Sequence, residues 1–112
     1  MTGVQTCALP IYFYFTVKEG TPANEVLAKL SRRIGEAWKR LGRQLLQFDE
    51  SKITKFHKEN EEYEEKSYQM LLYWKRREGS AATYQVLYDA LCDELVEQRE
   101  LAEKFCCVAT KK

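Results

Sequence analysis

Glycine and proline are scarce in this sequence, and long apolar runs are missing. Five glycines and two prolines in 112 residues leave few positions at which a helix must be interrupted. The longest apolar run, Ala8 to Phe15, contains Pro10. It is far shorter than the roughly 20 residues that a membrane-spanning helix needs. It also lacks the basic start and small-residue cleavage site of a secretory signal. We therefore expect one small folded domain without a membrane span.

Net charge and metal-ligating side chains are also in short supply. Lys and Arg number 18 and Asp and Glu 17, so the total charge does not favour nucleic acid or a membrane surface. The only histidine is His57. The cysteines follow no spacing typical of a disulfide framework or a zinc site; they are Cys7, Cys92, Cys106 and Cys107. We expect a reducing, cytoplasmic environment, with no metal and no cofactor.

The sequence offers little for catalysis. A chain of this length buries a smaller share of its surface than a large protein, which disfavours a deep active site. Only His57 with one of the cysteines could form a nucleophile–base pair, and His57 lies among charged residues at a predicted wet helix end. A glycine-rich phosphate loop is absent from the sequence. We expect no enzyme activity, no catalytic residues and no small-molecule substrate.

The first eleven residues fit nothing that follows them. Residues 2–11 closely resemble the translation of a sequencing-library adapter, and an ordinary disordered terminus is the alternative. Residues 12–17 alternate aromatic and β-branched side chains but are not assigned to an element. We predict an artefactual or disordered leader over 1–20, a domain over 21–106 and a short tail over 107–112.

Helix signals begin at Thr21, which we interpret as an N-cap before Pro22. Apolar residues then recur at helical spacing, and glycines at 35 and 79 mark the ends of two helices. Asp49 and Ser80 are expected to cap two later helices. These signals divide the domain into about six helices with short connections. The predicted fold class is all-α, an antiparallel six-helix bundle.

The apolar stripes of these helices predict the core. Trp38 and Trp74 occupy such stripes and are interpreted as core residues rather than binding anchors. The other expected core residues are Leu41, Leu45, Ile53, Phe56, Tyr63, Ser67, Met70 or Leu71, Val86, Leu87, Ala90, Leu91, Leu95, Leu101 and Phe105.

Three segments carry a resemblance to a known family. Residues 34–45 (IGEAWKRLGRQL) resemble the second-helix signature of a death domain, Trp-x-x-Leu-Ala-x-x-Leu. Residues 68–74 are similar to the fourth helix of that family, and residues 81–91 to the fifth. The resemblance runs from about 24 to 105 and extends to the death domains of the FAS-associated adaptor, the receptor-interacting kinase and the ankyrins. Gly42 departs from the usual Ala, and glycine inside a helix costs about 1 kcal/mol.

The resemblance implies the death fold and a non-catalytic module for homotypic protein–protein interaction. Such domains pair with other death domains largely through opposite charges and assemble signalling complexes for apoptosis or NF-κB-type signalling. Because the leader is interpreted as an artefact, we also expect the protein to extend upstream, with this chain as the C-terminal part of a larger adaptor, kinase or receptor.

Charges of opposite sign are segregated along the chain. Residues 29–43 carry a net charge of +5 and residues 89–103 one of −5. Complementary patches let copies stack head to tail. A solvated helix face is the better interpretation of any single charge, whereas the segregated pattern taken together favours an interface. The resemblance implies that Arg43 contacts a partner and that Asp49, the acid that opens the third helix, does so too. Asp49 could instead serve as the N-cap of that helix. The predicted partner-binding residues are Lys39, Arg40, Arg43, Asp49, Asp89, Asp93, Glu94 and Glu97.

A small nucleic-acid-binding domain is the alternative function. A basic second helix beside a turn is typical of a helix-turn-helix protein. The near-neutral total charge and the acidic neighbours oppose it, because they would repel phosphates.

Overall fold

The computed structural model describes residues 13–111, including the side chains of residues 16–108. Over this range the chain forms six α-helices, two short 3₁₀ turns and a two-stranded ribbon. The helices are α1 (Asn24–Ile34), α2 (Trp38–Leu45), α3 (Glu50–Glu59), α4 (Tyr63–Glu78), α5 (Tyr84–Cys92) and α6 (Arg99–Cys106). The strands are β1 (Phe13–Val17) and β2 (Cys107–Lys111), and the 3₁₀ turns are Gly35–Ala37 and Gly79–Ala81.

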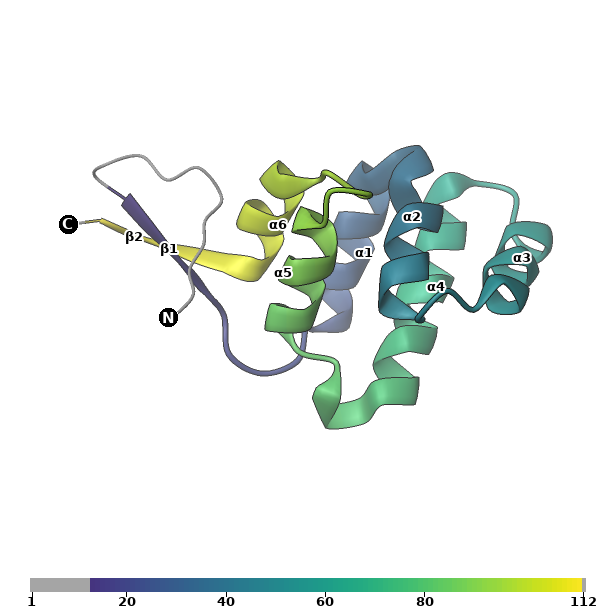
Figure 1. Cartoon of the computed structure of the whole chain (residues 1–112), viewed down its shortest axis with the longest axis horizontal. Coiled ribbons are helices and arrows are strands. Elements are labelled where there is room, and N and C mark those ends of the chain that lie inside the picture. The colour runs from purple at the N-terminus through teal and green to yellow at the C-terminus, as the bar shows by residue number, and fades with distance from the viewer. Residues whose placement is uncertain (1–12, 112) are drawn as a thin grey trace.

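The helices pack around α1 and α4, which lie against each other in the middle of the bundle (Figure 1). α5 and α6 form a pair, with α5 also contacting α2 and α6 contacting α1. α3 packs on α2 and α4 at the opposite end from the ribbon. The predicted six-helix bundle is therefore confirmed over the part of the chain that the structure describes.

Local sequence signals account for several helix ends. α1 and α4 end at Gly35 and Gly79, whose φ angles of 57° and 59° lie in the left-handed region that glycine adopts without a Cβ penalty. The Asp49 side chain accepts a hydrogen bond from the backbone N–H of Lys52 at 3.3 Å, as expected of an N-cap. These three predictions are confirmed.

Two predicted caps are wrong. α1 begins after Ala23 rather than at Thr21, because the preceding loop is held elsewhere: Pro22 is buried, and the Gly20 carbonyl accepts a hydrogen bond from the Tyr84 N–H at 2.9 Å. Ser80 falls inside a 3₁₀ turn. Thr83 caps α5 instead, and its hydroxyl accepts a hydrogen bond from the Val86 N–H at 3.2 Å.

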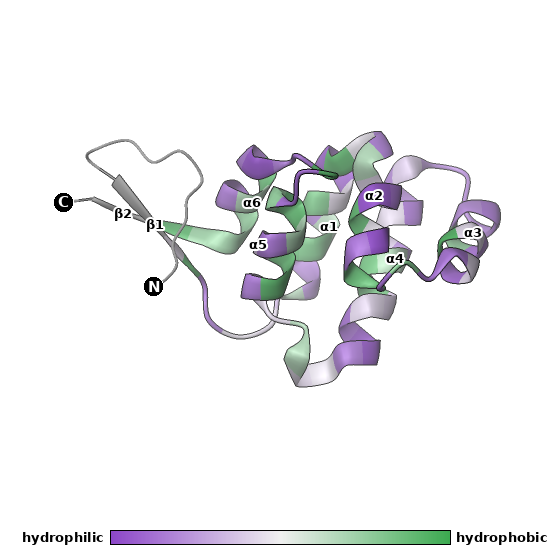
Figure 2. Cartoon of the chain, viewed as in Figure 1, coloured by the Kyte–Doolittle hydropathy of each residue, from purple (hydrophilic) through white to green (hydrophobic). Residues whose placement is uncertain are grey.

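The core lies where the apolar faces of the helices meet (Figure 2). Trp38 and Trp74 are almost fully enclosed, as predicted. Tyr63, Val86 and Leu95, expected in the core, are instead exposed. Tyr63 opens α4, where its ring lies 5.9 Å from the Lys66 ammonium, and Leu95 belongs to the turn between α5 and α6. Their apolar character marks surface positions that helical spacing alone does not distinguish from core.

The ribbon pairs the segment before α1 with the segment after α6 at one end of the helical domain (Figure 1). β1 and β2 are antiparallel, with Val17 opposite Cys107 and Phe13 opposite Lys111. The Lys18 N–H donates to the Cys106 carbonyl at 2.8 Å, which ties the ribbon to the end of α6. The ribbon adds a small β element to the predicted all-α bundle. The boundaries at 20/21 and 106/107 stay a prediction, and the adapter-like residues 1–11 lie outside the described residues.

Candidate interaction surface

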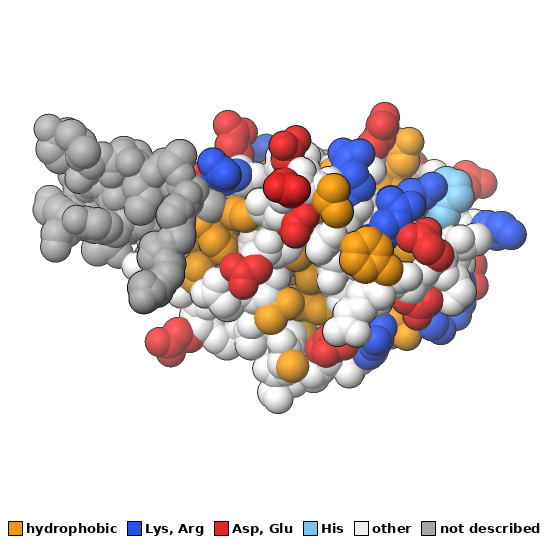
Figure 3. Space-filling view, viewed as in Figure 1, with side chains coloured by type: hydrophobic (Ala, Val, Ile, Leu, Met, Phe, Trp, Pro, Cys, Tyr) orange, Lys and Arg blue, Asp and Glu red, His pale blue; other side chains and the backbone are white. Residues whose placement is uncertain are grey.

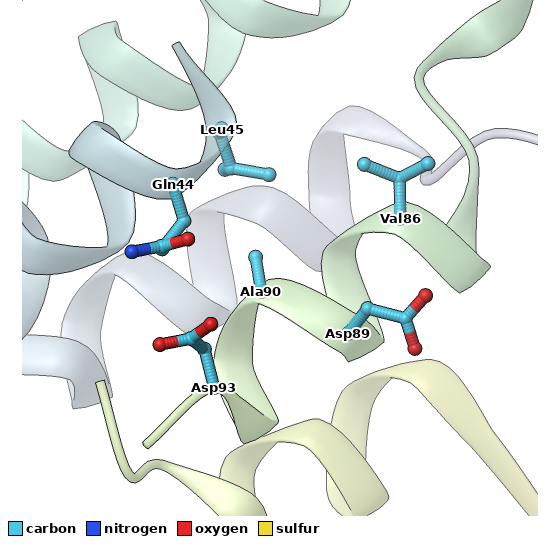
Figure 4. A pocket seen from close by; sticks show the side chains of 6 residues that line it. All are labelled: Gln44, Leu45, Val86, Asp89, Ala90 and Asp93. Atoms are coloured by element: carbon cyan, nitrogen blue, oxygen red, sulfur yellow. The ribbon is translucent and has the colours of Figure 1, made fainter. Parts of the chain in front are cut away.

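Two shallow pockets adjoin where α2 meets α5, and Gln44 lines both. The larger, of about 260 Å³, is lined by Gln44, Leu45, Val86, Asp89, Ala90 and Asp93 (Figure 4). The smaller, of about 140 Å³, is lined by Arg40, Arg43, Gln44, Phe48 and Leu95. We call the surface formed by these ten residues the α2–α5 face.

Large apolar side chains stand exposed on the α2–α5 face. Phe48 is 59% exposed, Leu95 56% and Val86 42%. Phe48 and the preceding Gln47 have φ angles of 63° and 56°, which non-glycine residues rarely adopt. Backbone strain of this kind persists where the surrounding structure enforces it, and it concentrates at functional sites. The loop after α2 thus holds an aromatic ring in solvent at a cost in stability.

Basic side chains border this apolar region on α2. Arg40 is exposed and makes no ion pair or side-chain hydrogen bond with any residue that the structure describes. Arg43 is half-buried, and its Nε donates to Glu50 Oε2 at 2.6 Å, which offsets part of its charge. Lys39 lines neither pocket and lies near His57 instead, whose pKa it lowers. Of the three predicted cations on α2, Arg40 is therefore the one most available to a partner.

Acidic side chains border the apolar region on α5 and the turn that follows. Asp89 Oδ1 accepts a hydrogen bond from Gln85 Nε2 at 2.9 Å, and Asp93 Oδ1 accepts one from the Leu95 N–H at 2.9 Å. Neither carboxylate has a cationic partner among the described residues. Asp93 thus positions Leu95 while leaving its own negative charge uncompensated.

Glu94 and Glu97 lie next to this face rather than on it. They line a separate pocket of about 330 Å³ together with Cys92 and Arg99. Glu97 has a φ of 55° in the tight turn between α5 and α6. On α6, burial raises the pKa of the Glu103 carboxyl, against the opposing effect of Arg99. The predicted acidic residues therefore divide between two neighbouring pockets.

The space-filling view displays the resulting charge pattern on one side of the molecule (Figure 3). Acidic side chains gather over α5 and α6, basic side chains stand over α2 and α3 with acidic ones among them, and apolar side chains lie between the two regions. On this side of the molecule the α5–α6 region is mainly acidic, whereas the α2–α3 region carries charges of both signs.

The basic run at residues 29–43 does not form one patch, however. Arg32 on α1 pairs with Glu64 on α4 at 3.1 Å, and Lys29 pairs with Glu25 at 3.5 Å. Only the α2 part of the run reaches the α2–α5 face. The reason is geometric: α1 packs mainly on α4, whereas α2 also contacts α5.

A comparison with protein-family models identifies this arrangement. The model of the Death domain matches residues 24–105, which include all six helices except the last residue of α6. The chain belongs to the death-domain family. A search of curated proteins returns no match. The helical bundle is therefore a death fold, and the death domain is a protein–protein interaction module.

Asp49 has a defined structural role in this death domain. Its carboxylate caps α3 and also accepts a hydrogen bond from Ser51 Oγ at 2.7 Å. These two donors lower the pKa of the Asp49 carboxyl, Ser51 most strongly, despite partial desolvation. Its role as a partner contact stays a prediction.

His57 and Cys106, considered above as a nucleophile–base pair, have other surroundings in the structure. Lys66 Nζ lies 2.9 Å from His57 Nδ1, and the His57 ring stacks on Trp38 with 6.5 Å between centroids. Burial raises the pKa of the Cys106 thiol far above its usual range, so this thiol does not form a reactive thiolate at neutral pH. Among residues 13–111, no group of side chains is arranged to hold a metal ion, and no helix is both long and apolar enough to cross a membrane.

Proposed function

We propose that this death domain binds other death domains through the α2–α5 face and thereby assembles cytoplasmic signalling complexes of the apoptotic or NF-κB type. The observation that carries the proposal is the uncompensated Arg40 beside exposed apolar side chains, with the uncompensated Asp89 and Asp93 across Gln44. The chain then acts as the C-terminal interaction module of a larger adaptor, kinase or receptor.

Both parts of the face have a physical role in binding. The apolar side chains supply affinity, at about 25 cal/mol for each Å² removed from water. The charges contribute less affinity, because exposed ion pairs are worth about 0–1 kcal/mol each. They instead speed encounter and exclude partners that place like charges opposite each other. Phe48 and Leu95 are accordingly expected to anchor the complex, and Arg40, Asp89 and Asp93 to select the partner.

The remaining predicted residues extend this surface at its edges. Arg43 supports it as a partly neutralised cation next to Glu50. Glu94 and Glu97 widen its acidic side, and Lys39 its basic side. The acidic side chains across Gln44 from Arg40 disfavour the alternative of phosphate binding, since they would repel a nucleic-acid backbone.

Binding to a panel of purified death domains tests the proposal. We expect at least one member to bind the full chain, and Arg40→Glu and Leu95→Ser to weaken that binding about tenfold or more. Lys55→Glu is the matched control, because Lys55 is exposed on α3 and its variant changes the total charge by the same amount as Arg40→Glu. Equal binding by Arg40→Glu, Leu95→Ser and Lys55→Glu would contradict the assignment of this face. Circular dichroism checks that each variant is folded.

A further inference from the structure

His57 on α3 and Lys66 on α4 are joined by a hydrogen bond between their side chains. We propose that this contact is a pH-sensitive latch, which holds α3 against α4 at neutral pH and releases α3 on acidification. The inference concerns the opening of one helix and does not require a partner protein.

Lys66 is a buried cation without an anionic partner. It is 7% exposed, and no carboxylate in the described part of the chain pairs with it. Its Nζ lies 2.9 Å from His57 Nδ1 and 5.9 Å from the centre of the Tyr63 ring. Burial of an ammonium group is costly unless a partner accepts its hydrogen bonds. Lys66 therefore depends on His57 Nδ1 as its side-chain hydrogen-bond acceptor.

This contact requires a neutral imidazole at position 57. An ammonium group has donors only, so His57 Nδ1 must accept, and the ring then carries its proton on Nε2. A second proton has to bind at Nδ1, where it replaces the acceptor by a donor. Two positive charges then face each other within hydrogen-bond distance. A single proton thus converts an attraction between α3 and α4 into a repulsion.

The charged groups that face His57 from the neighbouring helices are cations. Lys39 on α2 and Lys66 on α4 lower the pKa of His57 below its usual 6.5, and burial adds to their effect. Among the described residues, no carboxylate contributes to this shift. Release of α3 would take the ring away from both lysines and let its pKa return towards 6.5. The released state therefore binds the proton more readily, and it gains population as the pH falls below 6.5.

α3 is held to the bundle by few apolar side chains. It lies at the end opposite the ribbon, where it packs on α2 and α4 (Figure 1). Its buried residues are Ile53 and Phe56, whereas α4 has five. Segments with few buried apolar contacts open locally at a lower free energy than the core. Loss of the latch should therefore release α3 before it affects the rest of the bundle.

Movement of α3 would reach the α2–α5 face through the loop that joins α2 to α3. This loop carries Phe48, which lines the smaller pocket of the face. Arg43 and Glu50 form an ion pair across the same junction. Acidification should therefore weaken the binding of a partner at this face. This consequence rests on the proposed function, whereas the latch itself does not.

Hydrogen exchange of single amides in the full chain, followed by NMR at pH 7 and pH 5, tests the latch. After correction for the intrinsic exchange rates at each pH, protection of the α3 amides should fall about threefold or more at pH 5, relative to α1. His57→Asn keeps an acceptor near the position of Nδ1 but does not titrate. In this variant the protection of α3 relative to α1 should be the same at both pH values.

A second variant removes the other partner of the latch. Lys66→Met should reduce the pH dependence of α3 protection and move the pKa of His57 towards 6.5. Lys55→Met is the matched control, because Lys55 is exposed on α3 and its loss changes the total charge equally. It should respond to pH like the unchanged chain. If Lys66→Met does not fold, as judged by circular dichroism, His57→Asn decides alone.

Three results would overturn the latch. The first is equal relative protection of α3 at pH 7 and pH 5 in the unchanged chain, and the second is a fall that persists in His57→Asn. The third is a loss of protection in α1 that parallels the loss in α3, which would show global unfolding instead of local release. Binding of a death domain at pH 7 tests the proposed function separately. A chain that binds but whose α3 does not respond to pH refutes only the latch, and a chain whose α3 opens but that binds no death domain refutes only the proposed function.

Discussion

Gly42 and Ile53 approach each other so closely that α2 and α3 leave no room for a side chain between them. A Cβ placed on Gly42 would lie 2.5 Å from Ile53 Cδ1 and 3.4 Å from Met70 Cγ. Gly42 stands where the family usually has Ala, a change that the sequence predicts to loosen α2. The structure shows that the Ile53 side chain on α3 occupies the space that an Ala side chain would need. Glycine at position 42 lowers the helix propensity of α2, and the Ile53 side chain fills the core at that point.

This pairing predicts a non-additive response to mutation. Gly42→Ala gains about 1 kcal/mol of helix propensity but must displace the Ile53 methyl group. In an Ile53→Val background that methyl group is absent, and Gly42→Ala should then be more stabilising by about 0.5 kcal/mol or more. Urea unfolding of the four proteins in the cycle measures the difference. An identical effect of Gly42→Ala in both backgrounds would show that the contact does not matter.

Truncating the buried Trp74 should remove most of the stability of the domain. It is 1% exposed, so Trp74→Ala should cost about 3–5 kcal/mol of unfolding free energy, most of what a small domain has. Tyr63→Ala, at a ring that is 49% exposed on the same helix, is the control and should cost about 1 kcal/mol or less. Thermal melts followed by circular dichroism compare them. A nearly unshifted melt for Trp74→Ala would contradict the packing described above.

The strained loop after α2 should gain stability from glycine. Gln47 has a φ of 56°, so Gln47→Gly removes a left-handed penalty, and we expect a gain of about 0.5–1 kcal/mol. Gln47→Ala keeps a Cβ and serves as the control, with little change expected. Chemical denaturation of both variants decides the matter, and a glycine variant no more stable than the alanine variant would refute the strain.

Stability should decline between pH 7 and 5 because of His57. Lys39, then Lys66 and partial burial lower the pKa of His57 below its usual 6.5. The unfolded chain therefore takes up the proton more readily than the folded one, and stability is lost as the pH falls below 6.5 and through the lower folded pKa. His57→Gln should flatten this part of the profile in melts recorded from pH 7 to 5. A slope unchanged by the substitution would mean that other groups cause the decline.

Much of the fold is predictable because its signals are local. A glycine at 35 or 79 ends a helix through its own φ angle, and Asp49 caps α3 through a hydrogen bond three residues away. The packing of one helix on another depends on residues far apart in the sequence, so local signals do not predict it. Val86 has helical spacing and apolar character but lies on the side of α5 that faces a surface pocket.

The sequence displays the charges of the candidate site but not the shape of its surface. Arg32 and Arg40 belong to one basic run, yet one pairs with α4 and the other borders the α2–α5 face. Only the crossing of α1, α2 and α5 separates them. Phe48 was not predicted at the site because its exposure depends on the left-handed turn at residues 47 and 48, which contains no glycine to indicate it.

Amide chemical shifts of the ¹⁵N-labelled chain test the central claim most directly, when recorded during titration with a death domain that binds it. The account predicts that the perturbed amides cluster on the α2–α5 face, at Arg40, Gln44, Phe48, Asp89 and Leu95, while exposed amides of α3 such as Lys55 stay unchanged. Perturbations centred on α3, or on the Arg32–Glu64 side of the bundle, with the amides of the α2–α5 face unmoved, would contradict it.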